Sequence, residues 1–328
     1  MAVLVTVGIV SKNEENYIGN TLESIIGQNF NEFEIIVVDG NSQDKTIEIA
    51  EEVLNKSDIP HKILNEAHFG SYGLCFARNL VIDHSNPNSR YIAYTDADCI
   101  VNEKWLDELY QAVKGSEDKI VGAGGPRLIA TPKNKKELVI NTFITSFIGS
   151  GGNPAFVKRN LKFIDSIPNY NSIYKKDIIS DFRYDEKLIF SDDNELNFRL
   201  KKAGYIFRYV PTAKVYHRET DSIVQFARNM YSYGFNITNT IRKHHRMVKV
   251  PLPLTILFLF YLILLMPLYL LMGILALLPL TLYFIFALMV FLEVIYKSRT
   301  LLSLMVLLLL PVQHMSYALG VIYNFYSK

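Results

Sequence analysis

Two aspartates separated by one residue, Asp96 and Asp98, are the side chains in this sequence best suited to chemistry. They follow Arg90–Thr95, an aromatic and β-branched run that predicts a strand. Residues two apart in a strand point to the same face, so both carboxylates can turn toward one cation. Carboxylate oxygens suit Mg²⁺ and Mn²⁺, which keep coordination positions for substrate phosphates. The pair predicts a divalent-cation site; the alternative is that both residues only cap the next helix.

The segments that position these two aspartates are predicted to alternate between strands and helices. Val3–Val10 is a continuous apolar run typical of a buried parallel strand, and Phe33–Asp39 predicts a second one. A helical pattern lies between them, and Thr46–Leu54 predicts a helix after the second strand. This alternation indicates a doubly wound α/β sheet, whose ligands bind beyond the carboxyl ends of the strands. Asp39 and Asp96 should therefore lie on the same edge.

The sequence lacks the glycine patterns of two common nucleotide-binding classes. No Gly-x-Gly-x-x-Gly follows the first strand, and there is no Walker A sequence. Gly122–Pro126 is rich in glycine but matches neither pattern, so it predicts either a turn that approaches a ligand or an ordinary loop. Nicotinamide and P-loop chemistry are therefore disfavoured.

Composition divides the 328 residues into 1–249, which alternates apolar and charged segments, and 250–328, which is almost wholly apolar. The net charge of +2 gives no indication of a nucleic-acid partner. Two cysteines, Cys75 and Cys99, provide no disulfide framework, so we expect a reducing compartment and packed thiols. The run Val3–Val10 is too short for a signal peptide and lacks a basic flank.

The apolar tail has room for about three membrane-spanning helices, because each needs roughly 20 residues. We expect these at Leu252–Met272, Ile274–Tyr296 and Thr300–Phe325. A basic cluster precedes the first of these helices and predicts that residues 1–249 are cytoplasmic. Its members are Arg242, Lys243, Arg246 and Lys249. Three spans would place Lys328 outside. A kink at Pro311, with the polar Gln313 and His314 beyond it, leaves open a third segment that re-enters the membrane or lies in the interface.

Several motifs together resemble the family 2 glycosyltransferases of the GT-A fold. In chain order, they are Val7–Glu15, Ile36–Thr46, Ala77–Asn79, Asp96–Asp98 and Asp192–Leu200. Gly40 stands where many members have a second acidic residue, so base contacts would rest on Asp39 alone. The later segments Tyr216–Arg218, Gln225–Arg228 and Tyr233–Gly234, followed by apolar helices, resemble the exopolysaccharide branch typified by succinoglycan assembly.

The resemblance implies a GT-A-like doubly wound mixed sheet followed by a transmembrane bundle. It also implies an inverting transferase that uses Mn²⁺ or Mg²⁺, a nucleotide-sugar donor and a polyprenyl-linked or polysaccharide acceptor at the membrane. Asp98 would bind the metal, Asp96 the ribose or the metal, and His217 the metal or the diphosphate. The remaining residues implied to bind the donor are Ser11, Asn13, Glu14, Asp39 and Arg78. For Asp39 the alternative is a turn residue, and for Arg78 a surface ion pair.

Asp192 and Asp193 are the candidates for the general base. Asp192 and Glu195 have the spacing of a capping box, which would leave Asp193 in the first helical turn and facing the cleft. There it could take the proton of the acceptor hydroxyl as that oxygen attacks the anomeric carbon. The alternative is that both carboxylates are solvated at the start of a helix.

Gln225 and Arg228 stand one helical turn apart and are similar to the Gln-x-x-Arg element of processive synthases. The Trp that normally follows is Asn229 here, which argues against processivity; the only Trp, Trp105, is expected to pack rather than bind sugar. Two other functions remain open at this stage. One is nucleotidyl transfer, which usually needs a glycine-rich basic loop after the first strand. The other is a membrane-anchored protein that binds a nucleotide sugar without turnover.

Overall fold

The computed structural model of the chain describes residues 3–71, 73–150, 161–188, 192–218, 220–247 and 251–327. The side chain of Asp192, to which the sequence analysis gave a role, and the residues Lys249 and Lys328 lie outside the described residues. The chain forms two compact units. The first comprises Met1–Ala130 and Val157–Arg218, and the second comprises Thr131–Phe156 and Glu219–Lys328.

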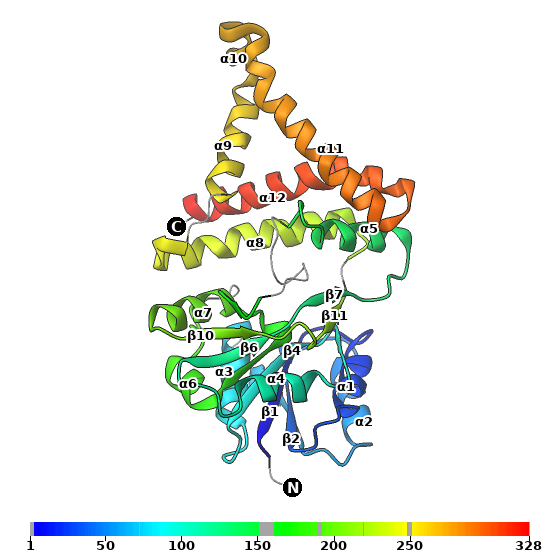
Figure 1. Cartoon of the computed structure of the whole chain (residues 1–328), viewed down its shortest axis with the longest axis vertical. Helices are drawn as coiled ribbons and strands as arrows, with labels where there is room; N and C mark the ends of the chain where they lie inside the picture. The colour runs from blue at the N-terminus through cyan, green and yellow to red at the C-terminus, as the bar shows by residue number, and fades with distance from the viewer. Residues whose placement is uncertain are drawn as a thin grey trace. The chain divides into compact units, whose positions relative to one another are not determined.

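The first unit contains a mixed sheet of eight strands in the order β3-β2-β1-β4-β9-β6-β10-β8 among the described residues (Figure 1). Their bounds are β1 Val5–Ser11, β2 Phe33–Asp39, β3 His61–Asn65, β4 Tyr91–Asp96, β6 Ile120–Gly124, β8 Phe163–Ile164, β9 Ser172–Lys175 and β10 Ile206–Tyr209. Strands β3, β2, β1 and β4 are parallel to one another, whereas β9 runs antiparallel to both β4 and β6. The mixed doubly wound sheet predicted from the sequence is confirmed.

Helices cover both faces of this sheet because alternate strand residues point to opposite sides. One core contains Ile35 and Val37 of β2 and residues of α1, α2 and α4. The other contains Ile36 and Val38 and residues of α3, α6 and α7. The helix bounds are α1 Ile18–Ile26, α2 Thr46–Leu54, α3 Leu74–His84, α4 Trp105–Val113, α6 Lys176–Phe182 and α7 Asp192–Lys202, with short 3₁₀ helices η1 Glu66–Phe69 and η2 Asn169–Asn171.

The strand register places the predicted site residues on one edge. Ser11 at the end of β1 pairs with Asp39 on β2, and Val10 pairs with Asp96 on β4. A second, three-stranded sheet lies in the same unit in the order β5-β11-β7, formed by Cys99–Val101, Val215–His217 and Arg127–Ile129. It joins three segments that are far apart in the sequence.

Most of the glycine-rich segment lies in strand β6, and its last two residues, Gly125 and Pro126, form the short connection to β7. Gly122 and Gly124 belong to the buried strand β6. A Cβ atom on Gly122 would lie 2.7 Å from the carbonyl oxygen of Ile173 on β9, and one on Gly124 would lie 2.7 Å from that of Asn171, which directly precedes β9. A Cβ on Gly125 would lie 2.0 Å from the carbonyl oxygen of Ala213. These glycines allow close approach of the protein's own backbone rather than of a ligand.

The second unit consists of helices. Their bounds are α5 Lys135–Ile144, α8 Ile223–Lys243, η3 His245–Met247, α9 Pro251–Ile263, α10 Leu265–Met272, η4 Gly273–Leu277, α11 Leu278–Ser298, η5 Leu301–Met305 and α12 Val306–Tyr326. Helices α9 and α10 lead to a turn at Gly273, whose φ of +60° lies in the left-handed region, and α11 returns as the second arm of a helical hairpin (Figure 1). Helix α12 packs beside α8, so packing groups α8 with the apolar tail, whereas composition grouped it with residues 1–249.

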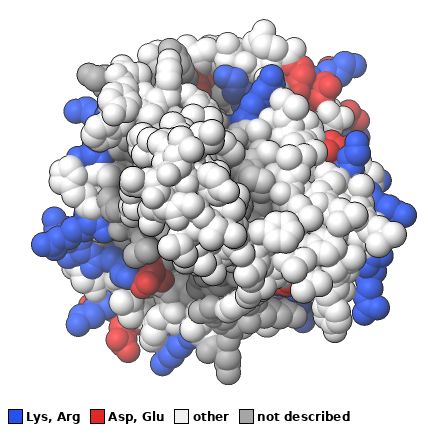
Figure 2. All heavy atoms as spheres, turned by 90° about the horizontal axis from the view of Figure 1, so that it is seen from above, with Lys and Arg blue, Asp and Glu red and all other residues white. Residues whose placement is uncertain are grey.

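Two helical stretches among the described residues, Leu265–Ser298 and Leu301–Tyr326, are long and apolar enough to cross a membrane. Pro253–Ile263 is a shorter apolar helix, so the first predicted span is divided into α9 and α10. Figure 2 looks onto the hairpin and shows mostly uncharged side chains at the centre of the view. Three membrane-spanning helices remain a prediction.

Candidate active site

Three carboxylates gather at the carboxyl edge of the main sheet. Asp96 ends β4, Asp98 lies two residues beyond it, and Glu14 belongs to the loop after β1. Burial raises the pKa of Glu14 to about 7, and the negative charges of Asp98, Asp44 and Asp96 contribute to the rise. Burial also raises the pKa of Asp96, with Asp98 adding to the effect and Arg78 opposing it. Like charges held this close favour binding of a proton or a cation.

His217 and Cys99 complete the cluster around Asp98. Strand β11 pairs antiparallel with β5, and this register sets His217 opposite Cys99. The His217 Nε2 atom lies 3.5 Å from Asp98 Oδ1, and Cys99 Sγ lies 3.7 Å from the same oxygen. One potential ligand atom from each of the three residues lies within 4.8 Å of the others. Asp98 and His217 were predicted as metal ligands, whereas Cys99 was expected only to pack.

The hydrogen bonding of His217 fits a metal ligand. Its Nδ1 lies 2.6 Å from the carbonyl oxygen of Arg218 and 3.3 Å from Nη2 of Arg127. The carbonyl can only accept and the guanidinium can only donate, so the shorter contact favours the proton on Nδ1. In a neutral imidazole this directs the Nε2 lone pair toward Asp98. Two acceptors that face each other need a positive charge between them, either a second proton on the ring or a metal ion. A backbone carbonyl that orients a ligating histidine is a common feature of protein metal sites.

The donor set also bears on which ion fits. Carboxylate oxygens and one imidazole suit Mn²⁺, and carboxylates alone suit Mg²⁺. The thiol of Cys99 is a softer ligand of the kind that Zn²⁺ accepts. The residues therefore fit a divalent cation and leave its identity open.

Two arginines flank the carboxylates. Arg78 of α3 is buried, with its Nη2 3.3 Å from Asp96 Oδ1 and its guanidinium 6.0 Å from the ring centres of Tyr94 and Tyr184. It is therefore not the surface ion pair considered as its alternative. Arg127 at the start of β7 is buried and lies 5.8 Å from the ring centre of Tyr170.

Arg127 was missed by sequence reasoning. Its charge opposes the effect of burial on the pKa of Asp98, which is raised. Its position directly after the glycine-rich segment was the only signal in the sequence. That segment matched no known nucleotide-binding pattern.

Asp193 lies in the same electrostatic environment. It is in the first turn of α7, where its Oδ1 accepts a bond of 2.7 Å from the backbone N–H of Asn194. Burial raises its pKa, while Arg78 opposes and Asp96 adds to the shift. Helix α7 begins at Asp192, and the Glu195 carboxylate is paired with Arg199 at 2.8 Å. The capping box expected between Asp192 and Glu195 depends on the Asp192 side chain, which lies outside the described residues.

Three residues at or after the ends of β1 and β2 were predicted to bind the donor, and in the structure they join the two loops that follow these strands. Asp39 is fully buried, and its carboxylate accepts bonds from the N–H of Ser42 at 2.8 Å and from its hydroxyl at 2.5 Å. Ser11 is buried and its hydroxyl donates to Asp39 at 3.4 Å. Asn13 has a positive φ of 56°, and its side-chain oxygen accepts from the N–H of Gln43 at 2.8 Å. The turn considered as the alternative for Asp39 is therefore present.

The remaining predicted residues are placed as follows. Gln225 and Arg228 lie on α8 in the second unit, where the Gln225 side-chain amide donates to Asn229 at 2.9 Å. Trp105 is fully buried and its indole N–H donates to Asn171 at 2.9 Å. Cys75 and Cys99 are both free and buried.

Residues 6–199 match the model of the family described as Glycosyl transferase family 2. The chain is also 28% identical, over 249 residues that cover 73% of it and 74% of the relative, to dolichyl N-acetyl-alpha-D-glucosaminyl phosphate 3-beta-D-2,3-diacetamido-2,3-dideoxy-beta-D-glucuronosyltransferase from Methanococcus voltae. A probable glycosyltransferase from Bacillus subtilis, YdaM, is 27% identical over 66% of this chain and 51% of its own length.

Among solved structures, the mannosyltransferase PcManGT from Pyrobaculum calidifontis, in complex with GDP-Man and Mn²⁺, aligns with a TM-score of 0.59. The alignment covers 100% of this chain and 88% of that one at 17% identity. At this identity the likeness establishes the fold.

Proposed function

Because the chain belongs to glycosyl transferase family 2, we propose that it is an inverting, metal-dependent glycosyltransferase acting at a membrane. Its substrates would be a nucleotide sugar and a lipid-linked or polysaccharide acceptor. The observation that carries the proposal is the convergence of Asp96, Asp98, His217 and Arg78 at one edge of the sheet, with Asp193 in their field. Transfer from a nucleotide sugar needs both a group that neutralises a departing diphosphate and a base.

Asp98 and His217 would hold the cation, with Asp96 beside them. When bound, a divalent cation neutralises charge on the diphosphate and orients it. Arg78 is held by Asp96 and its aromatic neighbours, so its charge is fixed in place before a substrate arrives. A buried, fixed cation stabilises developing negative charge without reorganisation, which suits contact with the diphosphate.

The loops after β1 and β2 would bind the nucleotide. Ser11, Asn13 and Asp39 keep these loops in one conformation, and Asp39 would meet the base or the ribose. Glu14 carries the pKa of about 7 and would face the donor from the same loop. The mannosyltransferase that shares this fold was solved with GDP-Man, which supports a nucleotide sugar at this edge.

Asp193 would act as the general base. The acceptor hydroxyl oxygen forms a bond to the anomeric carbon while the bond from that carbon to the diphosphate oxygen breaks. The hydroxyl proton passes to the Asp193 carboxylate. Attack from the side opposite the leaving group inverts the anomeric centre. The raised pKa of Asp193 makes it a stronger base than an exposed aspartate, and Asp192 is the alternative base.

The proposed acceptor follows from residues 250–328. These residues would cross the cell membrane more than once and hold the catalytic residues 1–249 at its cytoplasmic face. A polyprenyl carrier stays in the bilayer, so an enzyme that glycosylates it must work at the bilayer surface. The name of the Methanococcus voltae relative describes a dolichyl-phosphate-linked substrate, which supports a lipid-linked acceptor. Gln225 and Arg228 would contact the acceptor or its phosphate.

The test is to incubate the purified full chain with Mn²⁺, a panel of sugar nucleotides and polyprenyl-phosphate-linked sugars. We expect release of a nucleoside diphosphate together with a glycosylated lipid, and nuclear magnetic resonance should show an inverted anomeric centre. Release of pyrophosphate would indicate nucleotidyl transfer instead. Donor binding without any product would indicate a non-catalytic protein.

A further inference from the structure

Helices α8 and α12 touch through their backbones. A Cβ atom on Gly234 of α8 would lie 2.0 Å from the carbonyl oxygen of Tyr317 on α12. On the other side of the contact, a Cβ on Gly320 would lie 2.1 Å from the carbonyl oxygen of Tyr231. Small residues at a helix crossing allow this separation, and any larger side chain would force the helices apart.

The carboxyl-terminal ends of the two helices are also joined. The Arg242 guanidinium of α8 donates to the carbonyl oxygens of Asn324 at 2.8 Å and Phe325 at 3.0 Å. The side-chain amide of Asn324, which is fully buried, donates to the carbonyl oxygen of Phe235 at 2.9 Å. These bonds cap the end of α12 and show that the two helices run in the same direction.

This pairing conflicts with a membrane-spanning α12. If α12 crossed a hydrocarbon core about 30 Å thick, its parallel partner α8 would have to cross with it. The 21 residues of α8 include Arg228, Asn236, Asn239 and Arg242. Charged side chains at the centre of a bilayer cost several kcal/mol each, so α8 cannot take that position. Both helices must therefore lie where α8 is tolerated, at the interface.

The side of α12 away from α8 is apolar and exposed. This stripe begins in η5, repeats at intervals of three, four or seven residues, and consists of Leu301, Leu304, Leu308, Met315, Leu319 and Tyr326. Such spacing places its members on one helix face. Tyr323 is also exposed but lies at the edge of the helix contact, with its ring centre 6.3 Å from that of Tyr231 and 6.2 Å from that of Phe235 on α8. Tyrosine, which Tyr326 supplies at the end of the stripe, favours the headgroup level, and the exposed Lys243 and Arg246 lie at the last residue of α8 and just beyond it. An apolar face with aromatic and basic neighbours fits one leaflet of a lipid bilayer.

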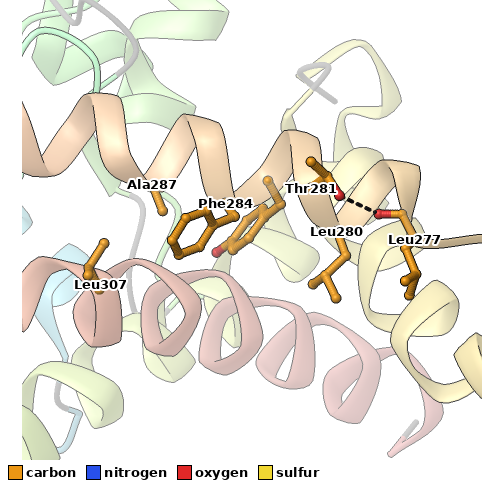
Figure 3. Close-up of a pocket in the computed structure, with 7 residues that line it drawn as sticks. Leu277, Leu280, Thr281, Phe284, Ala287 and Leu307 are labelled. Carbon is orange, nitrogen blue, oxygen red and sulfur yellow. Dashed lines mark hydrogen bonds between the residues drawn. The ribbon is translucent and has the colours of Figure 1, made fainter. Parts of the chain in front are cut away.

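A groove beside α12 has the same character. It has a volume of about 460 Å³ and lies between α11 and the start of α12, with Phe284, Ala287 and Leu307 among its lining residues (Figure 3). The hydroxyl of Thr281 in its wall is bonded to the carbonyl oxygen of Leu277 at 3.0 Å. The lining carries no charged side chain, so hydrocarbon rather than water suits this corner.

We infer that α12 is an in-plane interfacial helix whose stripe contacts the leaflet on the side of the basic cluster. The tail then crosses the membrane only through the hairpin of α9, α10 and α11, and Ser327 lies on the catalytic side. This replaces the predicted third span and the outside position of the carboxyl terminus. The inference rests on the membrane association in the proposed function but not on glycosyl transfer.

The test uses spin labels on single cysteines in the full chain, after Cys75 and Cys99 are replaced, reconstituted in lipid vesicles. Labels at Leu308, Met315 and Tyr326 sample the exposed stripe along the length of α12. For each label, the ratio of its collision rate with oxygen to its collision rate with a water-soluble nickel chelate reports how deep the label lies in the bilayer. We expect this ratio to agree within about twofold among the three labels, as for a helix parallel to the surface. Leu257 and Leu271 on the hairpin are the control pair and should differ clearly.

A maximum of depth at Met315 would overturn the inference, because a spanning helix is deepest at its centre. Spin–spin broadening at Leu308 in dilute vesicles would also overturn it, by showing that a second copy covers the stripe. A Ser327→Cys probe should resist an impermeant maleimide on intact cells and react in inside-out vesicles; the reverse would contradict it. If the labels at Leu257 and Leu271 are both as accessible to the nickel chelate as labels in water, the proposed membrane association is wrong. Absence of sugar transfer would contradict the proposed activity without changing any of these depth measurements.

Discussion

The loops after β1 and β2 and the cluster after β4 lie on the same edge of one sheet, but they use their polar groups in different ways. In the loops, Asp39 and Asn13 accept bonds from the N–H groups of Ser42 and Gln43. In the cluster, Asp96 pairs with Arg78 at 3.3 Å but also lies beside the negative charge of Asp98, and Asp98 faces His217 Nε2 at 3.5 Å. The polar groups of the first region bond to one another, whereas burial raises the pKa of both carboxylates of the second despite the arginines beside them.

Under the proposed function, this difference would separate residues that shape a binding surface from residues that take part in the chemistry. A carboxylate with its bonds complete stabilises the fold, and its removal weakens binding indirectly. A carboxylate crowded by others destabilises the fold, and this arrangement persists at sites where charge is used. From the sequence, Asn13, Asp39 and Asp96 were assigned to the donor, and Asp96 and Asp98 to the metal. The structure adds that Asn13 and Asp39 bond to the opposite loop or turn, whereas Asp96 and Asp98 lie beside each other.

The largest effect is expected for Asp98→Asn. Loss of a metal ligand removes several kcal/mol of charge stabilisation, so the rate of transfer should fall at least about 10³-fold with Mn²⁺ present. Asp118→Asn, an exposed aspartate of the same unit, is the matched control and should transfer at the normal rate. Full activity of Asp98→Asn, or of the unaltered enzyme in EDTA, would exclude the metal site.

Asp193→Asn should lower the rate by about 10²- to 10⁴-fold while donor affinity is retained, which is the usual effect of losing a general base. Because the base must be ionised, transfer by the unaltered enzyme should fall as pH drops through the raised pKa of Asp193. The residual activity of the variant should lack this acidic decline. A loss in Asp192→Asn but not in Asp193→Asn would reverse the two roles.

Ser42→Ala tests the loop region. The Ser42 hydroxyl donates to Asp39 and accepts from the N–H of Asn13 at 2.8 Å, so it joins the two loops. Its removal should raise KM for the donor several-fold and cost about 1 kcal/mol of stability, while kcat stays within about twofold. A loss in kcat as large as that of Asp193→Asn would show that this loop also takes part in the chemistry.

Glu14→Gln tests the cost of crowding in the cluster. The rise in the pKa of Glu14 to about 7 corresponds to about 3 kcal/mol, and partial exposure reduces the effect on stability to about 1–2 kcal/mol. In EDTA the variant should therefore unfold at a higher temperature than the unaltered protein. The gain should be complete above about pH 7 and disappear as pH falls toward the ordinary value of 4.5. Lower stability of the variant at pH 8 would contradict the crowding.

Much of the first unit could be predicted because its strands are local patterns. Phe33–Asp39 and Thr46–Leu54 have the predicted bounds, and the shared edge of Asp39 and Asp96 follows from parallel pairing. Asp98 and His217 were predicted as one site and lie together.

What was missed depends on contacts between distant segments. Cys99, Arg127 and His217 meet only because β5, β7 and β11 form a sheet from segments more than 25 residues apart, which no local pattern encodes. The glycines of β6 were misassigned because a close approach between strands and a close approach to a ligand require the same residue. The pairing of α12 with Arg242 is hidden in the same way, since a stripe of leucines is typical of both a span and an interfacial helix.

The most direct test of the difference between the two regions is a titration of Mn²⁺ into the purified chain with a nucleoside diphosphate, followed by electron paramagnetic resonance. We expect the unaltered protein and Ser42→Ala to bind Mn²⁺, and Asp98→Asn to lose that binding. Undiminished Mn²⁺ binding by Asp98→Asn, or equal loss in Ser42→Ala, would contradict the assignment of the metal to the cluster after β4.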